Sequence, residues 1–524
     1  MRDVRSPRLL VRAVALAVLL LVTAPLAQAQ TDGAVETHTA ALAALAEQID
    51  GILDHPRLNG VTVGVVVRSA TTGEVLYDRG GHQRVLVGSN QKLLTSTAAL
   101  AALGPDFRFH TSVLAEAAPR NGIIEGDLYL RGTGDPTLLP SRYDELATAV
   151  AARGITQVRG ALVADDTWFD AVRLGTDWSW QDETFSYAAP ISALSVSPDA
   201  DFNAGSVQVR IAPGAAVGAP ALVDLLPATR AVHVENRALT GPAGSPRRLS
   251  AMREHGADRI VVDGSVALDA NPAQPLRSVG DPTAYAADIF LDALARHGIT
   301  VRTPTRTGAT PAHASELAAL ESMPLRDLLV PFLKLSNNQI AEILVKTLGR
   351  QDIGTGSWDA GLRVVLRYVA AEGVDPERVQ LADGSGLSTS NLVAPDDLTA
   401  VLVGVQAEPW FEGWYAALPI AGEPGRMLGG TLAGRMLNTP AAGNVHAKTG
   451  SLTTASALSG YVSTATGERL AFSVVENGFI GAPPKEVEDA VAEALASWPR
   501  CLASCGESAD APGPGESVLS EGQP

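Results

Sequence analysis

The chain has 524 residues, of which 46% are hydrophobic and 19% charged, with a formal net charge of −17 at pH 7. This length allows several domains with large cores, and the composition is that of an ordinary globular protein. It excludes a disordered chain and a membrane-embedded one. The acidic balance offers no basic surface for a polyanion, so we expect no nucleic-acid partner.

The first 29 residues have the pattern of a secretory signal peptide. Four arginines precede an apolar run over residues 13–22, and Ala27-Gln28-Ala29 is a small-residue cleavage site. This segment holds four Arg and one Asp, so its removal changes the net charge from −17 to −20. With no Cys near the cleavage site for a lipid, we expect no membrane anchor after cleavage. The mature protein is expected to be exported, either periplasmic, extracellular or associated with the cell wall.

The first elements predicted in the mature chain are a helix around residues 39–53 and a β-hairpin over residues 61–79. The hairpin alternates in strand fashion around a Thr-Thr-Gly turn, as in "VTVGVVVRSATTGEVLYDR". A helix follows in "GSNQKLLTSTAAL", beginning at Ser89 and ending at Gly104-Pro105.

The region from about residue 107 to residue 310 differs from the flanking segments in its predicted secondary structure and composition. It is rich in short strands and turns, such as "GIIEGDLYLRGTGDPTLLP" and "GSVQVRIAPG", with one clear helix over residues 284–297. It contains Arg but no Lys. We interpret it as one or two domains inserted into the first domain.

Three more strands are predicted late in the chain, in "VHAKTGSL", "ASALSGYVSTATG" and "ERLAFSVVEN", followed by a helix over residues 485–498. Two early and three late strands fit one antiparallel sheet with helices packed on its faces, an α+β fold. Cys501 and Cys505 either form a local disulfide in an oxidising compartment or stay free. Residues 506–524 are rich in Pro, Gly and Ser, which predicts a disordered tail.

The use of lysine directs attention to three motifs, because only five of the 40 basic residues are Lys. Unlike a guanidinium group, an amine readily loses its proton. Ser89 and Lys92 lie three residues apart on a predicted helix, so their side chains share one face. A neutral Lys can take the proton of a nucleophilic serine. The alternative is an N-cap serine followed by a surface lysine.

The second and third motifs also combine hydroxyl, amide and amine groups. Ser336 and Asn338 stand just before an amphipathic helix, where they either cap the helix or face a nucleophile. Lys448-Thr449-Gly450 lies on a predicted strand. There Lys and Thr can bind an anionic end of a substrate and Gly permits close backbone approach, or the strand simply ends in a turn.

Together the three motifs resemble the triple signature of the penicillin-interacting serine enzymes, which are the β-lactamases and the penicillin-binding proteins. Ser89 and Ser336 are 247 residues apart, a longer separation than in compact β-lactamases. The long insertion resembles the class C low-molecular-mass penicillin-binding proteins, the D-alanyl-D-alanine carboxypeptidase/endopeptidase family. The resemblance covers nearly the whole mature chain, including "LRGTGDPTL", "WQDETFSYAAPISALSV" and "DGSGLS".

This resemblance implies a nested domain order. A transpeptidase/β-lactamase-like domain, with an antiparallel five-stranded sheet flanked by helices, would occupy residues 30–107 and 312–505. Two nested, mainly β inserted domains would interrupt it: domain II at residues 108–197 and 285–311, and domain III at residues 198–284.

The resemblance also implies that Ser89 attacks the carbonyl between the last two D-alanines of a peptidoglycan stem peptide. Lys92 would be the acylation base, with a pKa depressed from about 10.4 by burial and by the positive Lys448. Ser336, with Asn338 beside it, would pass the proton to the leaving amine. No metal or organic cofactor is implied.

The resemblance also implies that the third motif binds substrate. Lys448 and Thr449, with Gly450, would hold the terminal carboxylate, and the backbone N–H groups of Ser89 and Ser451 would form the oxyanion hole.

Asp182 matches the position where the family places an acid to meet the amine of a diaminopimelate side chain; the alternative is a turn Asp. After "DGSGLS" the family commonly has Arg, whereas this chain has Thr389. The resemblance therefore does not extend to recognition of that side chain's carboxylate, and an amidated or different side chain stays open as an alternative.

The partners implied are peptidoglycan peptides and β-lactam antibiotics. Two other functions stay open from the sequence: a β-lactamase-like hydrolase, and a non-catalytic penicillin-binding scaffold. They differ in how long an acyl group stays on Ser89.

Overall fold

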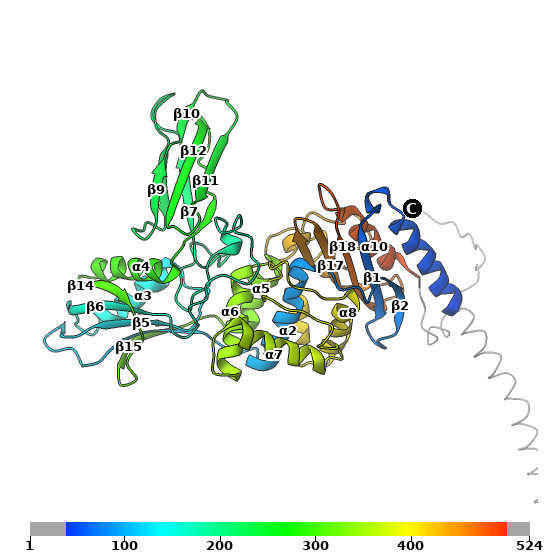
Figure 1. Cartoon of the computed structure of the whole chain (residues 1–524), viewed down its shortest axis with the longest axis horizontal. Coiled ribbons are helices and arrows are strands. Elements are labelled where there is room, and N and C mark those ends of the chain that lie inside the picture. Colours follow the sequence, from blue (N-terminus) through cyan, green and yellow to red (C-terminus); the bar gives the residue numbers. More distant parts are fainter. Residues whose placement is uncertain (1–37, 500–524) are drawn as a thin grey trace, which may run out of the picture.

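The computed structural model describes residues 38–499 and contains one large antiparallel sheet built from both ends of that range (Figure 1). Its strands are β1 (Thr62–Ser69), β2 (Val75–Arg79), β16 (His446–Leu452), β17 (Ala455–Ser463) and β18 (Arg469–Asn477). Their order is β16-β17-β18-β1-β2, and every neighbouring pair is antiparallel. The predictions for residues 1–29, for Cys501 and Cys505, and for the tail at 506–524 lie outside the described residues.

Helices cover both faces of this sheet. On one face the helix over residues 38–53 and α10 (Lys485–Ser497) share a core with the strands, in which Ile49 and Val491 are fully buried. On the other face α8 (Pro395–Gly404) packs against β1, β17 and β18. The helices beyond α8 are α2 (Gln91–Leu103), α5 (Leu325–Lys334), α6 (Asn338–Asp352), α7 (Trp358–Ala371) and α9 (Phe411–Ala417). Short 3₁₀ helices connect these elements: η1 (Pro56–Leu58), η2 (Gly88–Asn90), η3 (Ser186–Ala188), η4 (Val405–Ala407) and η5 (Gly430–Leu432).

A second sheet stands on the far side of α5, α6 and α7 (Figure 1). Its strands are β3 (His110–Ala115), β4 (Ile123–Ile124), β5 (Leu128–Gly132), β6 (Gln157–Asp165), β14 (Thr300–Thr307) and β15 (Ser315–Glu321). Their order is β14-β6-β5-β3-β15, with β4 also paired to β6. Two helices, α3 (Pro140–Ala151) and α4 (Pro282–Arg296), contribute apolar side chains to its core.

Two small sheets form an arm that projects away from the second sheet (Figure 1). One has the order β13-β7-β8, and the other has β10-β12-β11 with β9 paired to β12. Their strands are β7 (Ser206–Ala212), β8 (Leu222–Leu226), β9 (His233–Asn236), β10 (Leu239–Gly241), β11 (Arg248–Arg253), β12 (Arg259–Ala267) and β13 (Leu276–Ser278).

Two of the predicted domain boundaries fall beside or within elements that pack with the second sheet. The boundary at residues 311/312 assigned the segment 315–321 to the first domain, but β15 pairs with β3 throughout its length. The boundary at residues 284/285 falls inside the first turn of α4, which begins at Pro282 and packs on α3 and β6. The start of α4 carries a signal in the sequence, because Asp281 caps the helix and Pro282 stands at its first position. Within residues 38–499, no helix is both long enough and apolar enough to span a bilayer.

Candidate active site

Ser89 lies at the junction of η2 and α2, where the chain turns directly into the helix. The Lys92 amine is 2.8 Å from Ser89 Oγ. The N-cap position of α2 belongs to Asn90, whose side chain makes no capping hydrogen bond. Ser89 is therefore not the helix cap that the alternative interpretation requires, and its half-buried hydroxyl faces an amine.

Lys92 is completely buried and is held from three sides. Besides Ser89 Oγ, its Nζ donates to Asn338 Oδ1 at 2.7 Å and to the carbonyl of Ser385 at 2.9 Å. Burial lowers the pKa of Lys92 to about 7, while the negative charges of Glu342 and Asp383 act in the opposite direction. The amine can therefore lose its proton near neutral pH.

Two buried acids under Lys92 were not foreseen. Glu342 accepts hydrogen bonds from Trp358 Nε1 at 2.7 Å and from the backbone N–H groups of Gly384 and Ser385 at 2.9 and 2.8 Å. These bonds fix the segment whose Ser385 carbonyl holds Lys92. Burial, together with the charge of Asp383, raises the pKa of Glu342. The available signal was an acid on the apolar face of α6, one turn after Asn338.

Asp383 is the second of these acids and is equally enclosed. Its carboxylate accepts from Trp178 Nε1 at 2.9 Å, from Asn391 Nδ2 at 2.8 Å, and from the backbone of Gly386 and Ser388. These donors stabilise the negative charge of Asp383. The two backbone bonds also fix the turn that follows it. That turn carries "DGSGLS", quoted above for the family resemblance.

The second motif lies between α5 and α6. Ser336 adopts a left-handed backbone conformation with φ of +58°, which aims its hydroxyl at Lys448 Nζ, 2.8 Å away. The cap of α6 is Asn337, which accepts from Ile340 N. Asn338 is thus free to bridge the site: its Oδ1 accepts from Lys92 and its Nδ2 donates to the Tyr187 carbonyl at 2.8 Å.

The third motif lies on β16, next to the first two. Lys448 is fully buried, and burial lowers its pKa well below the ordinary value, with the positive charges of Lys92 and Lys485 acting in the same direction. Thr449 donates to Thr431 Oγ1 of η5 at 2.9 Å, a partner that the sequence did not reveal. Ser451, two residues further on, is exposed at the surface.

Close backbone approach between η2 and β16 depends on two glycines. Gly88 has a φ of +50°, and a Cβ there would lie 2.8 Å from Ser451 N. A Cβ on Gly450 would lie 2.2 Å from the Val87 carbonyl oxygen. Any larger residue would push the strand from the serine turn, so these glycines keep the backbone of Ser89 beside that of Ser451.

Asp182 lies in a long segment between β6 and β7. Its carboxylate accepts from Tyr187 OH at 2.8 Å, and the Tyr187 ring stacks on Phe185 with centroids 5.3 Å apart. The same segment contacts the turn that carries Thr389, because Ser390 Oγ donates to Asp177. Thr389 itself is exposed.

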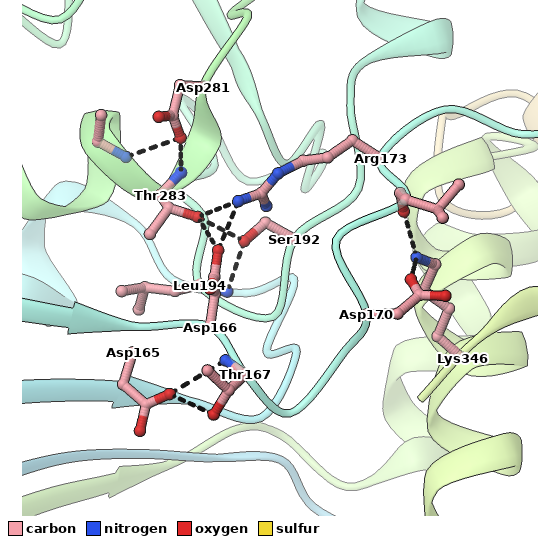
Figure 2. A network of polar contacts seen from close by, with 12 residues as sticks. Asp165, Asp166, Thr167, Asp170, Arg173, Ser192, Leu194, Asp281, Thr283 and Lys346 are labelled. Atoms are coloured by element: carbon pink, nitrogen blue, oxygen red, sulfur yellow. Dashed lines mark hydrogen bonds and ion pairs between the residues drawn. The ribbon is translucent and has the colours of Figure 1, made fainter. Parts of the chain in front are cut away.

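Polar contacts anchor this segment before it reaches Asp182 (Figure 2). Lys346 of α6 is buried and pairs with Asp170 at 2.6 Å, and its amine lies 3.9 Å from the centre of the Trp358 ring. Arg173 and Thr283 both bind the carboxylate of Asp166. The segment is therefore tied to the helix that carries Asn338 and to the inserted region.

The structure thus gathers Ser89, Lys92 and Asn338 into one hydrogen-bonded group and pairs Ser336 with Lys448 in a second. The charge of Lys92 is close enough to lower the pKa of Lys448, and Thr449, Gly450 and Ser451 follow Lys448 on β16. Asp182 joins it through Tyr187, whose carbonyl binds Asn338. In the described range 38–499, no group of three or more His, Cys, Asp or Glu side chains is arranged to hold a metal ion.

Known proteins share both the sequence and the fold of this chain. Residues 45–498 match the sequence model of the D-Ala-D-Ala carboxypeptidase 3 (S13) family. The chain is 46% identical to the D-alanyl-D-alanine carboxypeptidase of Actinomadura sp. (strain R39), over 91% of this chain and 90% of that protein. It is 30% identical to D-alanyl-D-alanine carboxypeptidase DacB of Haemophilus influenzae, over 80% of this chain and 86% of that protein.

The fold is similar to that of a solved structure, penicillin binding protein 4 (dacB) from Haemophilus influenzae. The TM-score is 0.73 at 27% sequence identity, covering 85% of this chain and 98% of that chain. Fold and motifs together define a penicillin-binding type of serine peptidase. The chain belongs to the D-Ala-D-Ala carboxypeptidase 3 (S13) family. The predictions of the family, of the α+β fold class and of an enzyme with D-Ala-D-Ala carboxypeptidase activity are confirmed.

Proposed function

We propose that this protein removes the terminal D-Ala from peptidoglycan stem peptides through an acyl-enzyme on Ser89, outside the cytoplasm. The observation that carries the proposal is the buried amine of Lys92, 2.8 Å from Ser89 Oγ and with a pKa of about 7. A serine hydroxyl needs a neighbouring base to become a nucleophile, and a lysine of this pKa supplies one at neutral pH.

In the acylation step the neutral Lys92 accepts the Ser89 proton while Oγ bonds to the carbonyl carbon of the penultimate D-Ala. Charge develops on the carbonyl oxygen, where the backbone N–H groups of Ser89 and Ser451 stabilise it. The C–N bond then breaks and the leaving amine takes a proton from Ser336. The proton on Lys92 then returns to Ser336, whose hydroxyl is held by Lys448 at 2.8 Å.

Water then hydrolyses the ester. It attacks the acyl carbon, the bond to Ser89 Oγ breaks, and the serine regains a proton while the shortened peptide leaves as a carboxylic acid. With a peptide that ends in D-Ala-D-Ala, these two steps remove the last D-Ala, which is the carboxypeptidase reaction. With a cross-linked peptide, the same two steps cut the cross-link, which is the endopeptidase reaction. We propose both reactions, since each breaks an amide after a D-Ala.

Substrate recognition would use both sides of the cluster. Lys448 and Thr449 on β16 hold the terminal carboxylate, and Gly450 keeps the strand close enough for the peptide to align. Asp182 binds the amine of the side chain of the third residue of the stem, with Tyr187 as its hydrogen-bond partner. Exposed Thr389 has no charge to offer the neighbouring carboxyl group, so an amidated or different carboxyl is accepted there.

We further propose the nested domain organisation, with the junctions moved to follow the strands. The catalytic domain would comprise residues 38–107 and 322–499 of the described chain, domain II residues 108–197 and 282–321, and domain III residues 198–281. Export through the segment at residues 1–29 would place the enzyme beside its substrate. β-Lactams would acylate Ser89; a related structure, of penicillin binding protein 4 from Haemophilus influenzae, is described as complexed with a novel β-lactam.

The direct test is release of D-Ala from a peptide ending in D-Ala-D-Ala. Wild type should release D-Ala, and Ser89→Ala should release none while remaining folded by circular dichroism. Equal release by both proteins would refute the nucleophile. Rapid penicillin turnover without peptide cleavage would instead favour the β-lactamase-like function. Penicillin binding without either reaction would indicate a scaffold.

A further inference from the structure

Lys485 is a cation at the edge of the site that the proposed mechanism does not use. It begins α10, and its half-buried amine donates to Ser451 Oγ at 3.2 Å. Ser451 supplies one oxyanion-hole N–H in the proposed mechanism. Lys485 is one of the five lysines of a chain that otherwise uses arginine. Of these five, Lys92 and Lys448 already belong to the cluster.

The acids around Lys485 are engaged elsewhere. Glu486 pairs with Arg57, and Glu488 and Asp489 pair with Arg435 at 2.7 and 2.6 Å. No carboxylate in residues 38–499 forms an ion pair with Lys485 itself. The amine is therefore the unpaired cation of the first turn of α10.

The backbone of Lys485 is fixed in place. Arg435 Nη2 donates to the Lys485 carbonyl at 3.2 Å while the same guanidinium binds the two acids of the next turn. This bond fixes where the side chain of Lys485 begins. The amine therefore reaches Ser451 from an anchored helix start.

Lys448, by contrast, already donates hydrogen bonds to two protein atoms. Its buried Nζ donates to Ser336 Oγ at 2.8 Å and to the Thr449 carbonyl at 2.9 Å. The positive charge of Lys485 is close enough to lower the pKa of Lys448 further. An anion bound over Ser451 would relieve the repulsion between these two amines, because it is attracted to both.

We propose that Lys485 is a specificity-determining residue that binds, with the Ser451 hydroxyl, the free carboxylate on the residue leaving the substrate. This inference rests on the proposed function and deepens it. The ligand class is a peptide whose last residue carries an α-carboxylate, or a β-lactam with the equivalent carboxylate. Lys448 and Thr449 hold the same group from the buried side, and Lys485 holds it from the solvent side.

The test compares an acetylated peptide ending in D-Ala-D-Ala with the same peptide carrying a C-terminal carboxamide. Lys485→Met should lower kcat/KM for the free acid about two- to fivefold and leave the carboxamide unchanged, since a partly exposed charged contact is of this strength. Lys485→Arg should retain most of the activity. Arg159→Met is the charge control, because Arg159 pairs with Glu125 at the surface of the second sheet, far from the cluster.

Outcomes separate this inference from the proposed function. If wild type cleaves the free acid and Lys485→Met keeps the wild-type ratio of acid to carboxamide, the role of Lys485 is wrong and the peptidase mechanism stands. An equal loss on both peptides also overturns it, because that result indicates a structural role. If wild type itself cleaves neither peptide and forms no penicillin adduct, the proposed function fails first.

Discussion

The pH dependence of acylation offers a quantitative test of Lys92 as the base. Only the neutral amine can accept the Ser89 proton. With a pKa of about 7, about 90% of Lys92 is neutral at pH 8 and about 10% at pH 6. Acylation by penicillin should therefore be about tenfold slower at pH 6 than at pH 8 and should level off above pH 8.

The size of this effect separates the buried lysine from an ordinary one. At its ordinary value near 10.5, less than about 1% of the amine would be neutral at pH 8, and the rate would fall about a hundredfold between pH 8 and pH 6. It would also go on rising to pH 10. Burial is the cause of the difference, because the amine has no contact with water and Glu342 and Asp383 compensate only in part.

The assay is the second-order rate constant for acylation by a fluorescent penicillin, measured by stopped flow at constant ionic strength between pH 5.5 and pH 9.5. Protein incubated at each pH and returned to pH 7.5 serves as the control for irreversible unfolding. A rate that is flat from pH 5.5 to pH 8.5, or that rises without levelling off to pH 9.5, would refute the reasoning.

Three substitutions test other parts of the account. Lys92→Arg should abolish acylation although charge is kept, because guanidinium is not a base; near-normal penicillin labelling would remove Lys92 from that role. Asp182→Asn should lower kcat/KM about 10- to 100-fold for a peptide with a free side-chain amine, because it removes a charge-assisted hydrogen bond of roughly 1.5–3 kcal/mol. A peptide whose side-chain amine is acetylated should lose much less. Thr389→Arg should shift preference from an amidated to a free side-chain carboxyl; a wild type that already prefers the free acid strongly would contradict our interpretation of Thr389.

The three motifs could be recognised from the sequence because each is local. Ser89 and Lys92 share a helix face by spacing alone, and Lys448-Thr449-Gly450 lies on one of the three late strands predicted from the sequence. Their order along the chain then identified the family, and with it the arrangement of the five-stranded sheet.

What the sequence could not show depends on contacts between distant segments. Glu342 resembles any acid on a helix, and only the fold places it under Lys92, 250 residues away in the chain. The left-handed conformation of Ser336 carries no compositional signal, because Gly and Asn are the usual residues there. The partner of β15 was likewise undetermined, since pairing across 200 residues leaves no local pattern.

The most direct test of the central claim is the intact mass of the protein after incubation with benzylpenicillin, followed over time and mapped by peptide analysis. The account predicts a single adduct on Ser89, formed in wild type and absent from Ser89→Ala, that persists long after free penicillin is removed. An adduct on another residue, or none at all, would contradict it.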